Sequence, residues 1–446
     1  MGADRPPGPD GLPLLGNTLA HVREQGDLYE RVAREYGSVA RLRVLGVGTF
    51  YQVADPGLVE SMLVTDRDRF RKHDLARRLL GDLLGDGLVL NEGETWRRHR
   101  RLVEPAFEAA RMETYANVMA DHAAQTAERW QAGETYDVLS EMQRLTLRII
   151  VESMFGTEID YDRWAIGDTV EALQEPGRPR KQPIAFAVPK WVPLPMWRRY
   201  GRAVERFDDL VAETISRRRE REGRRDDLLG TLLAARDGDG GLTDREVRDE
   251  LVTMLFAGHE TTAIALTFAW YLLARHPEVD RRLARELRTV LGDDRPGPGD
   301  VPDLEYTRWV VREAMRLYPP VPATPRETTT DVDLGGYRVP EGSLVLASQW
   351  AVHRDPAHYE DPLSFRPERW ANPDWHDFAY FPFGRGPRQC IGRRFALTEA
   401  TLVLATLARA FEVDLVSAPS LDLSVSVTTR PTSPVEVRVA ARTPPE

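Results

Sequence analysis

The chain has 446 residues, a formal net charge of −10 and 42% hydrophobic residues, which is the composition of a folded globular protein. The acidic balance argues against general nucleic-acid binding. The single cysteine, Cys390, excludes a disulfide within the chain and suits a reducing compartment, so we expect a cytoplasmic protein. The first residues lack the apolar core of a signal peptide, and no long uncharged apolar stretch predicts a membrane span.

The hydrophobic pattern predicts a mainly helical chain with a few short strands. Thr243 and Glu246 predict a capping box at the start of a long, largely apolar helix. Residues 66–94 predict an irregular loop region. Strands are expected at 39–44, 50–53, 322–328, 334–340 and 344–348, with a hairpin over 421–439. Helices are expected at 28–36, 56–64, 96–103, 112–130, 138–155, 202–219, 228–235, 243–275, 309–317 and 393–404.

Cys390 lies in a glycine-rich loop just before the last of these helices. Glycines at 384, 386 and 392 allow tight turns and close approach to a ligand. The N-terminus of the following helix favours the thiolate, which can serve as a nucleophile, a redox centre or a metal ligand. A buried free cysteine that acts as a small hydrophobe is the plainer interpretation, but it leaves Arg385, Arg388 and the glycines unexplained.

The spacing Phe383-x-x-Gly386-x-Arg388-x-Cys390-x-Gly392 resembles the haem-binding loop of the cytochrome P-450 family. By that resemblance Cys390 is the axial ligand of a b-type haem iron. The resemblance also implies that Arg388 pairs with a haem propionate, and that the rest of the loop holds the cofactor. A thiolate ligand pushes electron density toward iron and favours cleavage of the O–O bond.

Three further sites resemble positions where relatives hold the haem propionates. Trp96 and Arg100 are four residues apart and share one face of the expected helix over 96–103. Arg326 and His353 occupy the other two positions. A solvated helix end, a surface arginine and a loop histidine are the plainer interpretations of these residues.

The middle of the long helix predicts an oxygen-activation site at Ala257, Gly258, Glu260 and Thr261. A glycine in mid-helix costs roughly 1 kcal/mol against alanine, so we expect it to make room for haem and O₂. The Thr261 hydroxyl can bond to the Ala257 carbonyl and loosen the helix. Glu260 beside it can relay protons, as general acid catalysis requires. The stretch resembles the oxygen-binding helix of the family and favours O₂ plus electrons from NAD(P)H over peroxide; His259 is expected to face away.

Glu313 and Arg316 share a helix face, and Arg369 follows in the segment Pro-Glu-Arg-Trp at 367–370. An exposed ion pair of small effect is the plainer interpretation. Both motifs resemble the structural ion cluster of the family, so these three residues are expected to form a buried network with no catalytic role.

The resemblance covers nearly the whole chain and implies a mainly α fold with small β-sheets, in which a triangular helical part joins a smaller β-rich part. Residues 1–446 are expected to form one domain, with its β-rich parts near 37–70, 321–348 and 415–442. The proline- and tryptophan-rich stretch 182–197 is expected to be an access lid. Substrate is expected to touch Leu255, Val321, Ala323, Thr324 and Thr428.

The implied activity is insertion of one oxygen atom from O₂ into a C–H bond of an apolar small molecule, such as a terpenoid, macrolactam, polyketide or fatty acid. A haem-thiolate peroxygenase or isomerase and a haem-bearing sensor are the alternatives. A cysteine hydrolase would need a base near Cys390, and no histidine is near it in sequence.

Electrons are expected to come from separate proteins, because the chain carries neither a flavin segment nor a reductase segment. The expected partners are a small acidic ferredoxin and its reductase. The family's membrane-bound members carry an N-terminal anchor helix that this chain lacks, which favours a soluble bacterial type. The docking surface is expected to be a basic patch on the cysteine side of the haem, formed by Arg97, Arg98, Arg101, Arg385, Arg393 and Arg394.

Overall fold

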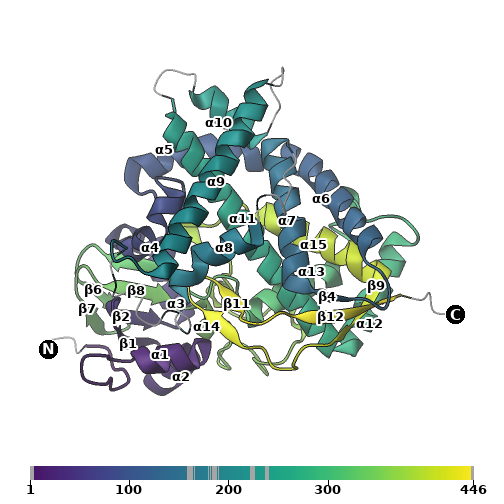
Figure 1. Ribbon diagram of the computed structural model, residues 1–446. Coiled ribbons are helices and arrows are strands. Elements are labelled where there is room, and N and C mark those ends of the chain that lie inside the picture. Colours follow the sequence, from purple (N-terminus) through teal and green to yellow (C-terminus); the bar gives the residue numbers. More distant parts are fainter. Residues whose placement is uncertain are drawn as a thin grey trace.

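Helices make up most of the molecule, and the short strands lie at its margins, which gives a roughly triangular outline (Figure 1). The computed structural model describes residues 5–157, 164, 166–178, 180, 182, 188, 190–220, 227–236 and 241–442. The expected class, mainly α with small separate sheets, is confirmed. The helices are α1 (Thr18–Glu24), α2 (Gly26–Tyr36), α3 (Pro56–Glu60), α4 (Asp74–Leu84), α5 (Gly93–Val103), α6 (Ala109–Arg129), α7 (Val138–Phe155), α8 (Ile166–Gln174), α9 (Pro195–Glu220), α10 (Leu228–Arg236), α11 (Asp244–Arg275), α12 (Pro277–Leu291), α13 (Glu305–Leu317), α14 (Gln349–Val352) and α15 (Arg393–Ala410).

The largest sheet has the strand order β1-β2-β8-β5-β3 and lies beside α1 and α2 (Figure 1). β2 and β8 run parallel, and the other neighbours in this sheet are antiparallel. Smaller sheets pair β4 with β12 and β9, β10 with β11, and β6 with β7. The strands are β1 (Val39–Val44), β2 (Gly48–Val53), β3 (Phe70–Arg71), β4 (Thr135–Asp137), β5 (Thr324–Thr328), β6 (Val332–Leu334), β7 (Tyr337–Val339), β8 (Leu344–Ala347), β9 (Phe411–Leu415), β10 (Leu423–Val425), β11 (Thr429–Pro431) and β12 (Glu436–Ala441).

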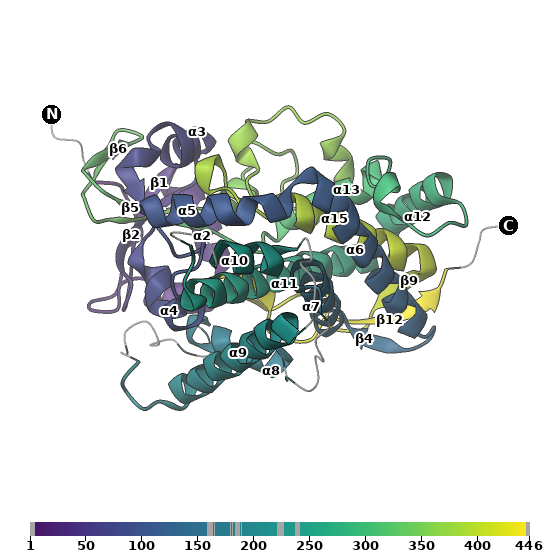
Figure 2. The ribbon, with the colours of Figure 1, turned by 90° about the horizontal axis from the view of Figure 1, so that it is seen from above.

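Helix α11 crosses the middle of the helical part (Figure 2). The expected capping box starts it: Thr243 accepts from the Glu246 backbone N–H, and Glu246 accepts from the Thr243 N–H at 2.7 Å. It packs against α7, α9, α13 and α15, so its apolar side chains are buried around most of its circumference. By length and composition α11 could cross a membrane, but 83% of its apolar window is buried inside the protein.

The helix expected at 56–64 is confirmed, although its second half is a π-helical turn, Ser61–Thr65, that follows α3. Two other sequence-based predictions of local structure were wrong. The expected loop 66–94 contains β3 and the amphipathic helix α4, which buries four leucines. The hairpin expected over 421–439 is limited to β10 and β11, because β12 pairs with β4 and β9 instead. A periodic pattern does not encode which distant strand will be the partner.

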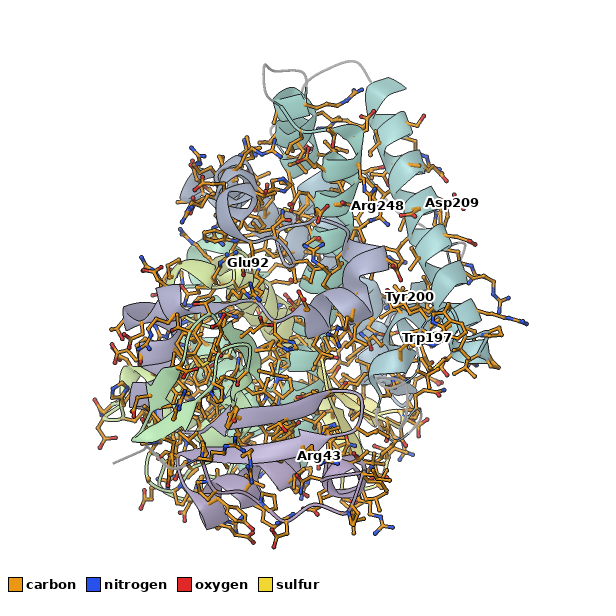
Figure 3. The ribbon with its side chains drawn as sticks, turned by 90° about the vertical axis from the view of Figure 1, so that its left-hand side faces the viewer. Arg43, Glu92, Trp197, Tyr200, Asp209 and Arg248 are labelled. Carbon is orange, nitrogen blue, oxygen red and sulfur yellow. The ribbon has the colours of Figure 1, made fainter. Side chains whose placement is uncertain are left out.

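Helix α9 and helix α4 pack together over one side of α11. The Tyr200 hydroxyl donates to the Leu79 carbonyl at 2.9 Å, and Lys190 pairs with Asp82. Arg248 of α11 pairs with Asp208 of α9. Figure 3 labels Arg248 and Asp209, the residue of α9 that follows Asp208. Of the expected lid over 182–197, residues 183–187 and 189 lie outside the described residues, while 195–197 begin α9.

The expected ion network is buried at the end of α13. Glu313 and Arg316 are fully buried, and Glu313 Oε1 lies 2.8 Å from Arg316 Nη2 and 2.9 Å from Arg369 Nε. The Trp370 indole N–H donates to Glu313 Oε2 at 3.0 Å. Arg316 also donates to the His353 carbonyl at 2.7 Å. The network therefore ties α13 to the segments that precede the Cys390 loop.

We expect Glu313→Gln to lower the free energy of unfolding by about 3–5 kcal/mol, because two buried guanidinium groups lose their shared carboxylate. Glu360→Gln is the matched control, since its pair with Arg366 is exposed and worth less than about 1 kcal/mol. Denaturant unfolding of the two haem-loaded variants measures the difference. Equal losses in both variants would show that the buried network adds no special stability.

Candidate active site

The Cys390 loop is a tight turn that holds the thiol at the wall of a cavity. Gly384 and Gly386 adopt φ values of 64° and 72°, which favour glycine. A Cβ on Gly386 would lie 2.3 Å from the Leu63 carbonyl oxygen, so this position also needs the missing side chain. The Cys390 N–H donates to the Phe383 carbonyl at 3.0 Å, and α15 begins three residues after the cysteine.

The Cys390 thiol is accessible from the cavity, although the surrounding protein shields it from bulk water. Burial raises the pKa of this thiol, and the Gly392 N–H and the charge of Arg100 only partly oppose the rise. The expected effect of the helix N-terminus is present, since the Gly392 N–H favours the thiolate, but burial outweighs it. A metal ion deprotonates a thiol that coordinates it, so an iron held by Cys390 would favour the thiolate.

The cavity has a volume of about 400 Å³ and lies between α11, α15 and the loop before β5. Its wall is largely apolar, which suits a flat aromatic cofactor and an apolar ligand. Ala257, Gly258 and Thr261 line it from α11, and Val321, Ala323 and Thr324 from the loop and strand opposite, as expected. Other apolar lining residues are Leu88, Val89, Phe107, Ile150, Met154, Met254, Val311, Met315, Phe395 and Leu397.

Five cationic side chains line the cavity: Lys72, Arg100, Arg326, Arg385 and Arg388. The structure thus brings Arg100, Arg326 and Arg388 together, as expected, and adds Lys72. Burial lowers the pKa of Lys72 to about 7 and that of Arg326 to about 10. Neither has an ion-pair partner within the described parts of the chain; Lys72 donates only to the carbonyls of Leu88 and Asn91 and Arg326 to that of Pro325.

Buried cations without counter-charges fit a ligand that carries carboxylates. The two propionates of a haem supply such charges next to an apolar slot that ends at a thiol. Arg388 lies with its guanidinium carbon 3.8 Å from the centre of the Trp96 ring and pairs with Glu92. Arg100 donates to the Gln389 carbonyl at 3.2 Å, so α5 is joined directly to the cysteine loop. The residues present therefore fit the implied cofactor.

The α11 stretch is loosened as expected, since the Thr261 hydroxyl donates to the Ala257 carbonyl at 2.8 Å. Gly258 has a further reason to be glycine: a Cβ there would lie 2.2 Å from the Ile150 side chain of α7. Close packing of two helices, as well as room for a cofactor, therefore requires it. His259 is buried away from the cavity, and its Nδ1–H donates to the Leu255 carbonyl at 2.9 Å.

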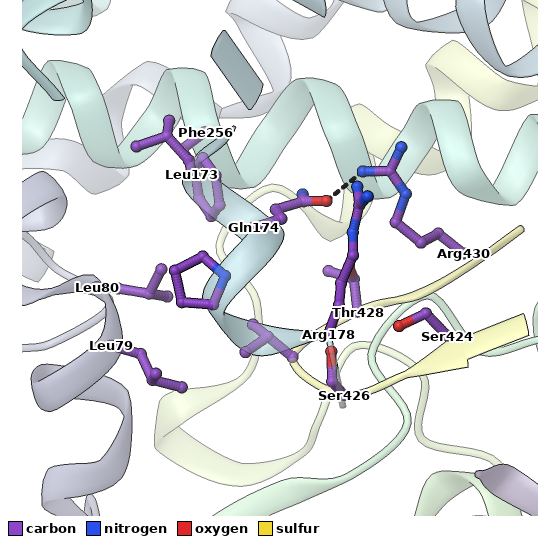
Figure 4. Close-up of a pocket in the computed structure, with 12 residues that line it drawn as sticks. Leu79, Leu80, Leu173, Gln174, Arg178, Phe256, Ser424, Ser426, Thr428 and Arg430 are labelled. Carbon is purple, nitrogen blue, oxygen red and sulfur yellow. Dashed lines mark hydrogen bonds between the residues drawn. The ribbon is translucent and has the colours of Figure 1, made fainter. Parts of the chain in front are cut away.

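Glu260 does not line the cavity, although it adjoins Thr261 in sequence. Its side chain is buried on the other face of α11, with Oε1 3.7 Å from Arg430 Nη1. Burial raises the pKa of Glu260, against the opposing charge of Arg430 and a polar interaction with Gln174. Beside this group is a small pocket of about 20 Å³, room for about one water molecule, lined by Gln174, Arg178 and Arg430 (Figure 4).

Three predicted site residues lie elsewhere. His353 is fully buried behind the cysteine loop, where its Nε2 accepts from the Phe381 N–H at 3.0 Å, so it cannot reach a propionate in the cavity. Leu255 faces the helical core rather than the cavity. Thr428 lines the small pocket of Figure 4 and not the large cavity. Each of these positions depends on helix rotation or hairpin placement, which motif spacing does not specify.

Two residues of the site were missed from the sequence. Lys72 lies in a connection between β3 and α4, where a single lysine carries no signal. Glu399 of α15 is buried beside Thr262, and burial raises its pKa well above the usual range. Glu399 falls on the apolar side of the helix expected after Cys390, and a glutamate in that position is a signal by which the sequence could have indicated it.

Of the six arginines of the expected basic patch, four are exposed: Arg97, Arg101, Arg393 and Arg394. The other two turn inward. Arg98 pairs with Glu246 of α11, and Arg385 lines the cavity and donates to the Asp377 carbonyl at 2.9 Å. The exposed charges thus come from α5 and the first turn of α15.

Comparison with known proteins places the chain in a family. The family model described as Cytochrome P450 matches residues 6–438. Cyclooctat-9-en-7-ol 5-monooxygenase from Streptomyces melanosporofaciens is 36% identical over 90% of this chain and 87% of its own length. Cyclooctatin synthase from the same organism is 37% identical over 90% of this chain and 88% of its own.

Pentalenene oxygenase from Streptomyces avermitilis is 33% identical and aligns with 98% of this chain and 97% of its own length. The similarity therefore extends across the strands, the helices and the cysteine loop rather than a single motif. With a family match over nearly its whole length, this chain belongs to the cytochrome P450 family of haem-thiolate monooxygenases.

Proposed function

We propose that this cytochrome P450 inserts oxygen into a largely apolar, cyclic terpenoid that carries a hydroxyl group, in preference to a macrolactam, a polyketide or a fatty acid. The observation that carries this proposal is the apolar cavity of about 400 Å³ above Cys390. Relatives of this chain are named for the oxidation of cyclooctat-9-en-7-ol and pentalenene. When bound, the haem supplies the oxidising chemistry, and the cavity wall selects and orients the ligand.

The unpaired polar atoms of the cavity wall support a ligand with a hydroxyl group. On α11 the hydroxyls of Thr261, Thr262 and Thr267 donate to carbonyls four residues earlier. The Thr253 hydroxyl lines the cavity and has no partner in the part of the chain that the structure describes, and the same holds for Gln349 Oε1. A buried polar atom without a partner is costly, so a ligand hydroxyl at this wall is favoured.

A binding panel tests the substrate class. We expect a cyclic diterpene alcohol to bind roughly tenfold more tightly than its deoxy hydrocarbon, because one satisfied hydroxyl contributes about 1 kcal/mol or more. Thr253→Val should remove most of that difference. Thr267→Val is the control, since its hydroxyl is already bonded to Ala263 in the core. The ligand-induced shift of the haem Soret band measures each affinity; tighter binding of a long-chain fatty acid would contradict the proposal.

Cysteine-ligated haem and the use of O₂ are properties of the family. Since the chain has one cysteine, we assign the iron ligand to Cys390. We further propose NAD(P)H as the source of electrons, which distinguishes the enzyme from a peroxygenase, an isomerase or a sensor. The buried carboxyl group of Glu260, next to Thr261 in sequence, supports a route for protons during O₂ use.

We propose that Thr261 handles protons at the cavity and that Glu260 supplies them from the opposite face of α11. The small pocket of Figure 4 is lined by Gln174 and Arg430, which interact with Glu260, and it has room for about one water molecule. Because burial raises the pKa of Glu260, its acid form persists closer to neutral pH than that of an exposed glutamate.

We expect Glu260→Gln to lower the yield of product per O₂ consumed by roughly tenfold or more, since the amide cannot release a proton. The same substitution should leave ligand binding unchanged, because Glu260 does not line the cavity. Parallel measurement of O₂ uptake, product and released hydrogen peroxide gives the yield. A native yield of product per O₂ in this variant would show that Glu260 does not belong to the proton route.

Cytochrome P450 relatives receive electrons from redox partners, and we propose a small acidic ferredoxin and its reductase for this one, in the cytoplasm. The exposed arginines of α5 and α15 support this partner by their charge and by their position. Arg100 of α5 contacts the Gln389 carbonyl, so the exposed face of α5 lies close to the iron ligand. We propose that residues 1–446 form one functional domain.

Charge reversal at Arg97 or Arg101 should slow reduction by an acidic ferredoxin roughly tenfold at low salt, with a smaller effect at high salt. Ligand binding should be unaffected, since both side chains are exposed. Arg34→Glu on α2 is the control with the same change in net charge at an exposed site distant in sequence. Stopped-flow reduction measures the rates. Equal rates in all variants would show that the ferredoxin docks elsewhere on the protein.

A further inference from the structure

A buried histidine outside the cavity joins α5 to α11. His99 is fully buried; its Nδ1 lies 2.6 Å from Glu250 Oε1 and its Nε2 lies 3.2 Å from Glu246 Oε1. A neutral imidazole carries one N–H and can donate to only one of these carboxylates. Without a second proton, the lone pair of His99 Nδ1 would face the Glu250 carboxylate oxygen. The geometry therefore requires a second proton, which His99 and Glu250 share.

The charges around His99 retain that shared proton. Burial opposes charge on the ring, but the two carboxylates outweigh it and raise the pKa of His99. Burial also raises the pKa of Glu250, and the nearby Asp249 adds to this rise. Arg98, whose Nη2 lies 3.3 Å from His99 Nε2, acts in the opposite direction.

Glu246 is the ionised member of the cluster. Although burial opposes its charge, hydrogen bonds from Thr243 and His99 lower the pKa of Glu246 to about 2. It stays charged at neutral pH, so the Nε2 proton of His99 keeps an acceptor throughout. The proton that can be lost as the pH rises is the one between His99 and Glu250, and it belongs to the pair rather than to either residue.

The same cluster contacts the segment that holds two cations of the cavity. The Asn91 side chain lies 3.2 Å from His99 Nδ1, and a Leu88 N–H stabilises the charge of Glu250. On its other side this segment accepts from Lys72 Nζ, at 3.0 Å to the Leu88 carbonyl and 2.8 Å to that of Asn91. Arg388 also donates to the Asn91 carbonyl, at 3.0 Å.

We infer that His99 and Glu250 form a proton-dependent positioning pair for the cofactor: their shared proton fixes residues 88–91, and these residues hold Lys72 and Arg388 where the haem carboxylates bind. Neither member of the pair lines the cavity. When the proton is lost, the 2.6 Å contact becomes repulsive, the segment loosens, and the cationic end of the cavity loses its fixed geometry. Retention of haem therefore decreases at high pH.

The sign of this dependence follows from linkage. A group whose pKa is raised by folding stabilises the folded form at low pH, and this contribution is lost as the pH rises through the raised pKa. The ordinary histidine pKa is 6.5, so the loss occurs above that value. We expect the rate of haem transfer from the native protein to excess apomyoglobin to rise roughly tenfold across this transition.

Two variants separate this role from simple packing. In His99→Gln the pair is gone, so haem transfer should be fast already at low pH and should not change with pH. In Glu250→Gln the amide N–H donates to the neutral ring at every pH, so transfer should stay slow without a pH step. His276→Gln is the control: its ring contacts the Leu272 carbonyl at 2.8 Å, at the far end of α11, and both rate and profile should remain native.

Thermal unfolding of the same haem-loaded proteins completes the test. A native pH profile in His99→Gln overturns the inference. The inference is also overturned if Glu250→Gln loses haem as fast as His99→Gln and its unfolding temperature falls by the same amount. That result would mean that the cluster contributes only general packing. Slow, pH-independent haem transfer in Glu250→Gln, together with fast transfer in His99→Gln, supports the inference. If His99→Gln does not fold, the pH profile of Glu250→Gln alone decides the question.

Discussion

One buried carboxylate determines where the iron ligand can lie. Burying the Glu313 charge is costly, and the protein compensates with Arg316, Arg369 and the Trp370 indole. Arg316 extends the cluster to the His353 carbonyl, and the His353 ring accepts from the Phe381 N–H at the entrance of the cysteine loop. The position of the Cys390 thiol is thus fixed by a polar cluster that has no contact with the cavity.

Helix α11 divides the site into an apolar and a polar side. Its cavity face carries Ala257, Gly258 and Thr261, while Glu260 points back toward Arg430. Glu399 lies buried beside Thr262. The helix therefore separates the place where an apolar ligand is held from groups that carry protons, which allows both to occur within one turn of the chain.

The sequence predicted the parts of the molecule that depend on local order. The loop around Cys390, the capping box at Thr243, the bond from Thr261 to Ala257 and the pair of Glu313 with Arg316 are all set by short spacings. What could not be predicted depends on tertiary packing. The direction of the Glu260 side chain follows from the rotation of α11, and the burial of His353 follows from a cluster that spans three segments. Lys72 joins the site only because β3 and α4 bring its connection to the cavity.

The cations at the cavity also concern how the protein is assembled. Lys72, Arg326 and Arg388 repel one another in a region that water hydrates poorly, as their lowered pKa values reflect. The cofactor is then the counter-ion that completes the fold, and its binding free energy adds to the stability of the native chain. A chain without the cofactor consequently lacks this counter-ion, so the cationic end of its cavity is less stable than in the haem-loaded protein.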